Sequence, residues 1–336
     1  MRSPNDMKWH GDIAHVGSVF QRAREIRGLY QKTVASLCGV NRSTINRFEN
    51  TGNTSDKTFK AYVAALCRPE ANPPLTERQT AFLLRLQEPS RRRDEYDKHL
   101  ATLSFDMIRS PDCPESLREL VARLRREKRP AFIVDPLYCM HVANETMLQL
   151  FGVAPQSLIL RDWEMWHSIA AKFKPGSPVR AAQPDWDGYF PRTMAFYFME
   201  RQVVPFLFTR RMQAVIQRLG SYNTQDGRSF RSWWAQLKGL GIEFDTSQLP
   251  RTLLFQGRTL RVHAEVIHEL PLYPGSPVRF VLGGWNPDSR DEHACEVFDQ
   301  LARESAGADL VFAKDHDLDH SNHVNTWPEV RDVAAT

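Results

Sequence analysis

Side chains able to hydrogen-bond gather in the short stretch that runs from Arg42 to Asn50. At helical spacing, they share one face of the stretch; the members of this set are Arg42, Ser43, Asn46, Arg47 and Asn50. Arginine carries paired donors that match the N7 and O6 acceptors of guanine, and one well-placed pair discriminates between bases by roughly 1 to 3 kcal/mol. This face therefore has the chemistry to read base edges in the major groove of DNA.

The stretch that must position this face is Gln31 to Phe48, which reads QKTVASLCGVNRSTINRF. Its apolar and small residues predict two short helices that cross at a tight turn. Gly39 is placed to end the first helix, and Asn41 to cap the second. Val40 and Ile45 have the spacing of a hydrophobic staple. The residues expected to face inward are Val34, Cys38, Val40, Ile45 and Phe48, with Ala35 small enough to let the second helix pass.

Two flanking stretches extend this pair into a larger helical unit. Residues 16–28 place Val19, Phe20, Ala23 and Ile26 on one face, and residues 58–66 do the same with Phe59, Tyr62, Val63 and Leu66. Any two-helix corner could bury the apolar set of the central stretch. The flanking helices favour a compact all-helical domain over residues 16–68.

The order of these helices resembles the lambda-repressor-like (XRE) DNA-binding domain over about residues 16 to 67. The resemblance is carried by Arg24, Gly28, Gln31, Ala35, Gly39, Val40, Ile45 and Glu49. It implies a buried ion pair between Arg24 and Glu49. The family usually has glycine two residues after Glu49, whereas this chain has Gly52, three residues on, so the loop of residues 53–55 is not assigned a DNA contact.

The same resemblance implies which residues meet DNA. Gln31 would contact a phosphate at the start of its helix, where Lys32 adds a cation. Arg42, Ser43 and Arg47 would contact base edges. The remaining two, Thr44 and Asn46, would lie beside the sugar–phosphate backbone or the groove wall.

Length and composition suggest a second domain. The chain has 336 residues with 42% hydrophobic content, eight Trp and nineteen Phe, which is ample for packed cores. Residues 1–70 hold 11 basic against 6 acidic residues, whereas residues 288–336 hold 4 against 12. Because phosphate attraction is a local field, a basic head confines nucleic-acid contacts to one end. The five scattered cysteines predict reduced thiols, and we expect a cytoplasmic protein that has no membrane segment.

Before the second domain, the sequence predicts an arm and a linker. Residues 1–15 have little periodicity and predict a flexible arm. Residues 69–128 predict a helical linker in which Thr76 can cap a helix over residues 75–86. The arginine run 91–93 is expected on a solvated helix face. A further helix is expected within residues 110–128, with an apolar stripe of Leu117, Leu120, Val121 and Leu124.

Residues 129–287 have the pattern of an α/β sensor module. Strands are expected at 131–134 and 138–143, and Asn144 can cap a helix that ends at Gly152. An aromatic middle with helices at 193–219 and 229–237 precedes strands at 251–255, 259–270 and 278–282. This order predicts a five-stranded antiparallel sheet with covering helices packed over one face, the PAS-like arrangement. The whole chain is then an α+β protein.

This region resembles the ligand-binding domain of MmyB-like transcription regulators over about residues 115 to 287. The resemblance rests on RPAFIVDPLYCMHVANETMLQLFG, on the run Ser229, Phe230 and Trp234, and on the closing hairpin 251–287. It implies a small apolar ligand, such as a fatty acid, as an effector and no required cofactor. The pocket residues that we expect are Trp163, Trp166, Phe196, Phe230 and Trp234.

Residues 288–336 form an acidic tail. Ser289 and Glu292 could form a capping box before a helix. His and Asp residues within 314–323 could bind zinc or nickel, although polar tails collect such residues by chance, and we assign no metal site. His141, His263 and His268 could ligate haem or simply be hydrogen-bonded. No nucleophile, phosphate-loop or dinucleotide motif is present, so no enzymatic activity is expected.

These patterns predict a transcription regulator that binds a palindromic operator in double-stranded DNA as a homodimer, modulated by a small apolar ligand. The protein would be cytoplasmic and associated with the nucleoid when bound to its operator. The alternative is a DNA-bound interaction platform, whose C-terminal part mediates dimerisation or recruits a partner without a ligand.

Overall fold

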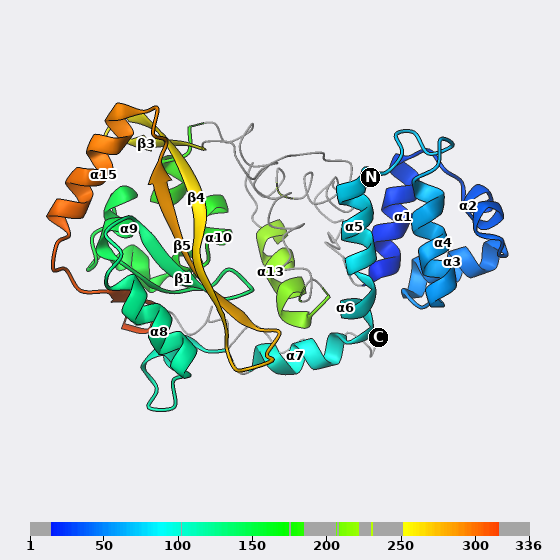
Figure 1. Ribbon diagram of the computed structural model, residues 1–336, viewed down its shortest axis with the longest axis horizontal. Helices are drawn as coiled ribbons and strands as arrows, with labels where there is room; N and C mark the ends of the chain where they lie inside the picture. The colour runs from blue at the N-terminus through cyan, green and yellow to red at the C-terminus, as the bar shows by residue number, and fades with distance from the viewer. Residues whose placement is uncertain are drawn as a thin grey trace, which may run out of the picture. The chain divides into compact units, whose positions relative to one another are not determined.

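The chain is an α+β protein with an N-terminal helical region and a C-terminal antiparallel sheet, as the sequence predicts. A computed structural model describes residues 15–101, 103–174, 176–184, 206, 208–221, 230 and 251–315 (Figure 1). The chain forms two compact units, each built from two separate segments. The first unit comprises Met1–Lys98 with Pro191–Phe244, and the second comprises His99–Phe190 with Asp245–Thr336.

The first unit is helical. Its elements are α1 (Val16–Ile26), α2 (Gln31–Cys38), α3 (Arg42–Thr51), α4 (Asp56–Leu66), α5 (Glu77–Arg85), α6 (Gln87–Arg91), most of α7 (Arg93–Ala101) and α13 (Arg210–Ser221). Four aromatic rings form its centre, with the Phe20 ring 5.0 Å from Phe48, 4.9 Å from Phe59 and 5.1 Å from Tyr62 between centroids. Such edge-on and tilted arrangements are the favoured ones for aromatic rings, so this cluster holds α1, α3 and α4 together.

The ends of these helices follow the expected residue chemistry with one exception. Gly39 adopts the left-handed conformation at φ 65° and ends α2. Thr76 forms a capping box with Gln79 at the start of α5. Asn41 occupies the N-cap position of α3 as expected, but its side chain makes no capping hydrogen bond. Helix α3 therefore begins without a side-chain cap, and the preceding turn and the packing of the helix set its start.

Gly17 allows α1 to approach α3 very closely. A Cβ atom at this position would lie 2.0 Å from the carbonyl oxygen of Phe48 and 2.8 Å from that of Glu49. No real Cβ tolerates such contacts, so only glycine fits here. This requirement could not be predicted from the sequence, because it depends on a neighbour 31 positions along the chain.

The helical segment after α4 is tied to the first unit by specific contacts. Arg91, expected on a solvated face, is half exposed but pairs with Asp56 at 2.5 Å and reaches the carbonyl oxygen of Thr54 at 3.4 Å. Farther along, the Asp97 carboxylate accepts a hydrogen bond at 2.8 Å from the backbone N–H of Arg210, the first residue of α13. This last contact joins two segments that are 113 residues apart in the sequence.

The second unit is built on one antiparallel sheet. Its strands are β1 (Ala131–Val134), β2 (Met140–Ala143), β3 (Arg251–Phe255), β4 (Arg258–Pro271), β5 (Arg279–Pro287) and β6 (Val311–Phe312), in the order β3-β4-β5-β1-β2-β6. The expectation of five strands is wrong, because β6 pairs with β2 through Phe312 and Val311. A two-residue strand is too short to show an alternating pattern, so only its partner reveals it.

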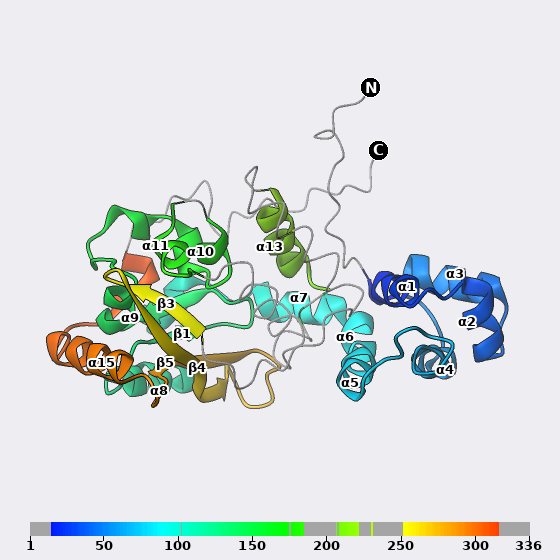
Figure 2. The same ribbon diagram turned by 90° about the horizontal axis from the view of Figure 1, so that it is seen from above.

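Helices lie on both sides of this sheet (Figure 2), with α8 on one side and α10 and α11 on the other. The helical elements are η1 (Phe105–Arg109), α8 (Glu115–Leu124), α9 (Glu145–Leu150), η2 (Leu158–Arg161), η3 (Trp163–Trp166), α10 (Ala170–Phe173), α11 (Pro178–Ala181), α15 (Glu292–Glu304) and η5 (Ala313–Asp315). Asn144 caps α9 as expected, by accepting a hydrogen bond from Met147 N–H at 3.0 Å. The cap of α15 is Asp291, so the expected capping box of Ser289 and Glu292 is wrong.

Two adjacent glycines explain how β4 and β5 pack at their centre. The strand register shifts between Val266 and His268, which marks a bulge at Ile267. A Cβ on Gly284 would lie 2.7 Å from the Ile267 side chain, and one on Gly283 would lie 3.2 Å from the Phe132 ring. The glycines therefore make room for these side chains over the sheet.

Several expected features fall on residues that the structure does not describe. They are the arm before His15, most of the helix at 193–219, the helix at 229–237 except Phe230, and the tail after Asp315. Within the described ranges, no helix is long and apolar enough to cross a membrane.

Candidate nucleic-acid interface

Helix α3 has one buried and one exposed face. Ile45, Phe48 and Glu49 are buried, whereas the four polar residues at its first two turns are exposed; these are Arg42, Ser43, Asn46 and Arg47. The apolar residues fix the helix on α1 and α2, and the same periodicity turns the polar residues to solvent. The face on which the DNA-reading prediction rests is therefore accessible on this unit.

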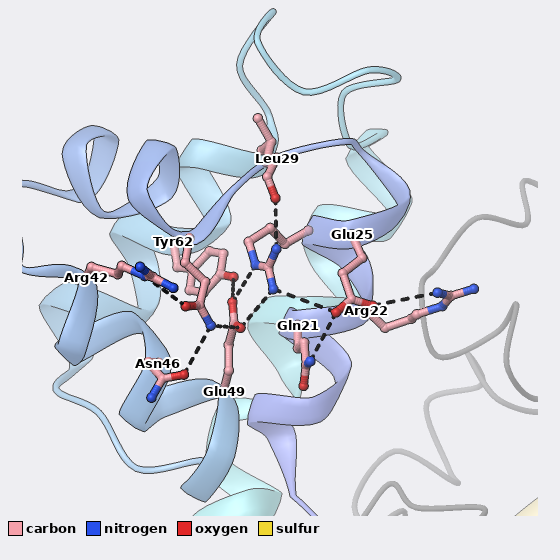
Figure 3. Close-up of polar contacts among 10 residues, drawn as sticks. Gln21, Arg22, Glu25, Leu29, Arg42, Asn46, Glu49 and Tyr62 are labelled. Carbon is pink, nitrogen blue, oxygen red and sulfur yellow. Dashed lines mark hydrogen bonds and ion pairs between the residues drawn. The ribbon is translucent and has the colours of Figure 1, made fainter.

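A buried carboxylate, Glu49, stands at the centre of a polar network behind this face (Figure 3). Its oxygens accept hydrogen bonds from Arg24 Nε at 2.7 Å and Nη2 at 3.0 Å, from the Tyr62 hydroxyl at 2.5 Å and from Gln31 Nε2 at 2.8 Å. Glu49 is 2% exposed, and Arg24 is 8% exposed. The ion pair implied by the family resemblance is present, and it is bidentate and buried.

The network shifts the pKa values of the groups around Glu49. Burial lowers the pKa of Arg24, but the hydrogen bond and the negative charge of Glu49 outweigh burial and raise it overall. Burial, with the nearby Glu49 charge, raises the pKa of Tyr62 well above its ordinary value. The phenol therefore stays protonated and remains a hydrogen-bond donor to Glu49.

Gln31 connects this buried network to the exposed face. Because its Nε2 donates to Glu49, its amide orientation is fixed, and Nε2 also lies 3.3 Å from Asn46 Oδ1. The Oε1 atom then faces outward and accepts a long hydrogen bond, 3.4 Å, from Arg42 Nε. Within the part of the chain that the structure covers, the terminal nitrogens of Arg42 have no partner. Arg42 is thus oriented through Nε while its paired donors stay available.

The remaining residues expected at DNA lie on the same two helices. Lys32 is exposed on α2, and Ser43 and Arg47 are exposed on α3. Neither Lys32 nor Arg47 forms an ion pair with any residue whose position is described. Thr44 is half buried. The structure thus joins Gln31, Arg42 and Asn46 by hydrogen bonds and leaves the two further cations free.

Two residues predicted to be in the core of this helix pair are only half buried, namely Cys38 and Val40. Cys38 is the last residue of α2 and Val40 follows its C-cap, where the chain leaves the helix and one side of each residue meets solvent. Burial nevertheless raises the pKa of the Cys38 thiol to about 11, so it is protonated at neutral pH. Cys38 is therefore an inert packing residue.

Sequence reasoning missed the polar role of Tyr62, which it treated only as an apolar core residue. The signal that could have found it is chemical, because a buried phenol hydroxyl needs a hydrogen-bond partner. In this unit a buried carboxylate was already expected at Glu49. The Tyr62 hydroxyl supplies a donor that the Glu49 carboxylate needs, and the carboxylate supplies the acceptor that the hydroxyl needs.

The aromatic residues proposed for a ligand pocket are only partly described. Trp166 is buried in the second unit, and its indole N–H donates to the Leu160 carbonyl at 2.8 Å. Phe230 is buried and belongs to the segment assigned to the first unit. Phe196, Trp234 and the side chain of Trp163 lie outside the described residues. Trp166 is a core residue with its one polar atom satisfied.

Two of the histidines considered for haem ligation, His141 and His263, lie beside aspartates. His141 is buried with Asp135, the His141 Nε2 to Asp135 Oδ2 distance being 3.1 Å, and His263 is 3.8 Å from Asp288 at the surface. Among residues with described positions, no group of three or more His, Cys, Asp or Glu side chains could hold a metal ion. The His- and Asp-rich tail lies almost entirely outside those residues.

The geometry of α2 and α3 thus presents oriented hydrogen-bond donors on a short helix, and this is the feature of the chain best suited to recognise another molecule. No protein-family model matches the chain, and a search of curated proteins finds no significant match.

Proposed function

We propose that this chain is a sequence-specific DNA-binding transcription regulator that acts as a homodimer and responds to a small apolar ligand. The observation that carries the proposal is the exposed face of α3, where Arg42 and Arg47 project from a helix whose other face is buried. The α2–α3 pair joined at Gly39 supports a helix-turn-helix. The antiparallel sheet, in which β5 lies between β4 and β1, supports a PAS-like sensor unit, although helices cover both of its sides and not one.

The arrangement on α3 matches what reading a base pair requires. Arg42 and Asn46 are four residues apart, as are Ser43 and Arg47, so they form two adjacent rows on one side of the helix. An α-helix fits the major groove, and its first turns carry the residues that reach base edges. Gln31, one helix earlier, holds Arg42 in place before DNA arrives. Less side-chain entropy is then lost on binding.

The proposal includes two copies of the chain bound to one palindromic site. Two recognition helices related by a twofold axis must be about 34 Å, or a multiple of that distance, apart to meet successive major grooves. A ligand changes the affinity for DNA only to the extent that it prefers one arrangement of the dimer over another. Native mass spectrometry of the purified protein tests whether the chain is a dimer and whether it holds a ligand, because it reports the mass of the assembly and any co-purifying lipid-sized mass.

The decisive experiment concerns the two arginines. An operator is first selected from a pool of random duplexes with the full-length protein, and its affinity is then measured at fixed salt. Arg42→Ala with Arg47→Ala should weaken operator binding by at least about thirtyfold, because each arginine is assigned roughly 1 to 3 kcal/mol of base recognition. The matched control is Arg123→Ala on α8 with Arg126→Ala in the turn that follows it, which removes two exposed arginines from the other unit.

Two results would contradict the proposal. One is an operator affinity that is unchanged in the α3 variant. The other is an equal loss of affinity in both double variants, which would mean that net charge alone decides binding. A loss confined to the α3 variant, together with relaxed sequence preference in a repeated selection, is the expected outcome.

A further inference from the structure

A groove on the second unit has the size of a ligand site. Its volume is about 730 Å³, within the range of pockets that hold small molecules. Four elements form it, namely α9 with the loop after it, α11, the turn between β3 and β4, and the C-terminal half of α15. All four belong to the second unit.

The floor of this groove is apolar. It is formed by buried side chains from three of the four elements, which are Leu150, Phe151, Val153, Ala182 and Leu301. Leu254 and Ala181 are exposed beside them. Such a floor favours a hydrocarbon body, since each CH₂ group moved out of water gains about 0.8 kcal/mol.

The rim of the groove is acidic. Two carboxylates, Glu145 and Glu304, line it together with three glutamines, and the lining residues whose positions the structure describes include no Lys, Arg or His. Across the described parts of the chain, neither glutamate takes part in an ion pair. Gln149 lies between them, donating to Glu145 at 3.0 Å and accepting from Ser305 at 2.9 Å. This contact joins α9 to the end of α15 and fixes the rim.

We propose that this groove binds an apolar molecule that carries a protonated amine. It would be the effector site of the regulator proposed above. Only this effector role rests on the proposed function; the binding of the amine does not. An ammonium group can pair with Glu145 or Glu304 while the hydrocarbon covers the floor. A fatty acid would bring a third carboxylate to the same rim and would be repelled. The charge of the rim therefore selects an amine over the acid that the family resemblance implies.

The test uses three probes with the same twelve-carbon chain, namely dodecylamine, dodecanoic acid and 1-dodecanol. Their binding to the full-length protein is measured by calorimetry at pH 7.5, below the concentrations at which they self-associate. Dodecylamine should bind best, and Glu145→Gln with Glu304→Gln should weaken it about threefold to tenfold, as expected for two exposed ion pairs. Added salt should reduce the same difference.

Two controls localise the effect. Ala181→Trp fills the groove from its exposed edge and should abolish binding of dodecylamine, while Glu296→Gln removes an exposed carboxylate from α15 outside the groove and should change nothing. The groove-filling variant is needed because a second hollow in the same unit is lined by Arg109, Arg118 and Arg125 and could take an acid. Acid binding that Ala181→Trp leaves intact belongs to that hollow.

Three outcomes would overturn the inference. They are the absence of dodecylamine binding, dodecylamine binding that survives Ala181→Trp, and groove-dependent binding of dodecanoic acid at least as tight as that of dodecylamine. None of these measurements involves DNA. Failure here leaves the arginine experiment on α3 untouched, and failure of that experiment leaves the amine site standing as a binding site without a regulatory role.

Discussion

At the scale of single residues, the protein buries ionisable groups in two different states, one charged and one neutral. Glu49 is buried as a charge, because Arg24, Tyr62 and Gln31 together supply four hydrogen bonds to its two oxygens. His167 is fully buried as a neutral ring, and its Nδ1 accepts hydrogen bonds from the backbone N–H groups of Ile169 and Ala170. Burial lowers the pKa of His167 to about 4, although Asp135 opposes the shift.

His167 makes the stability of the protein depend on pH in a predictable direction. The unfolded chain binds a proton on this ring near pH 6.5, whereas the folded state binds one only near pH 4. The stability that depends on the neutral ring is therefore complete above pH 6.5 and is lost as the pH falls toward 4. Between pH 7 and pH 5 we expect a loss of about 2 kcal/mol from this group.

The measurement is the urea midpoint of unfolding at pH 7 and pH 5 for the native protein and for His167→Asn. Asparagine keeps an acceptor for the two backbone N–H groups but cannot be protonated in this range. The variant should therefore lose clearly less stability on acidification than the native protein. Equal losses in both proteins would show that other groups account for the pH dependence.

At the scale of elements, the first unit depends on how closely α1 and α3 approach. The aromatic cluster of Phe20, Phe48, Phe59 and Tyr62 supplies the attraction between the helices. Gly17 supplies the space, because the α3 backbone occupies the position where its side chain would be. The position of α3, and with it the direction of Arg42, thus depends on Gly17, a residue without a side chain that lies against the buried side of α3.

We expect Gly17→Ala to lower the free energy of unfolding by about 3 kcal/mol, near the upper end for overpacked sites, because two backbone oxygens obstruct the added methyl group. Gly39→Ala is the comparison, since nothing lies within 4 Å of the Cβ that it adds. It should cost only about 1 kcal/mol, from the strain of a left-handed alanine. Urea unfolding of both variants measures the difference.

Operator binding by the same two variants separates position from stability. At a temperature where both remain folded, Gly17→Ala should bind DNA more weakly than Gly39→Ala, because it shifts the helix that carries Arg42 and Arg47. A smaller loss of stability in Gly17→Ala than in Gly39→Ala would contradict the packing argument.

At the scale of the whole molecule, the chain is not a simple series of domains. The sequence suggested domains in consecutive order, whereas the first unit includes residues 191–244 from the middle of the chain. Asp97 on α7 accepts from the first N–H of α13, and the rings of Tyr96 and Phe206 meet edge to face at 5.5 Å. These contacts bring a segment from the C-terminal half of the sequence into the unit that carries α3.

The contact at Asp97 gives a prediction for this joined unit. Asp97→Ala removes the acceptor of the first backbone N–H of α13 and should cost about 1 kcal/mol, as is typical of one lost hydrogen bond. Hydrogen exchange of the backbone amides in residues 210–221 should become faster, while exchange in α1 to α4 should not change. Asp94→Ala, on the same helix and exposed, is the matched control. Unchanged exchange in α13 would show that the contact with Asp97 does not hold the segment.

The sequence by itself determined the local elements of this protein. Apolar periodicity, together with residues that cap or end helices such as Gly39, Thr76 and Asn144, predicts most of them. These are helices α1 to α5, α8, α9 and α15 and strands β1, β3, β4 and β5. The candidate recognition face was also readable, because a helix that buries Ile45 and Phe48 must expose Arg42 and Arg47. These features depend on residues a few positions apart, whose spacing the sequence displays directly.

Only the tertiary structure decided the features that depend on distant partners. The two-residue strand β6, the close approach at Gly17, the role of Tyr62 beside Glu49 and the amine-selective groove each join segments far apart in the chain. A residue's own type does not reveal which distant atom will lie beside it. The packing of the folded chain decides which distant atoms meet. It places a carboxylate against an arginine in one unit, and it places two other carboxylates at the rim of an apolar groove in the other.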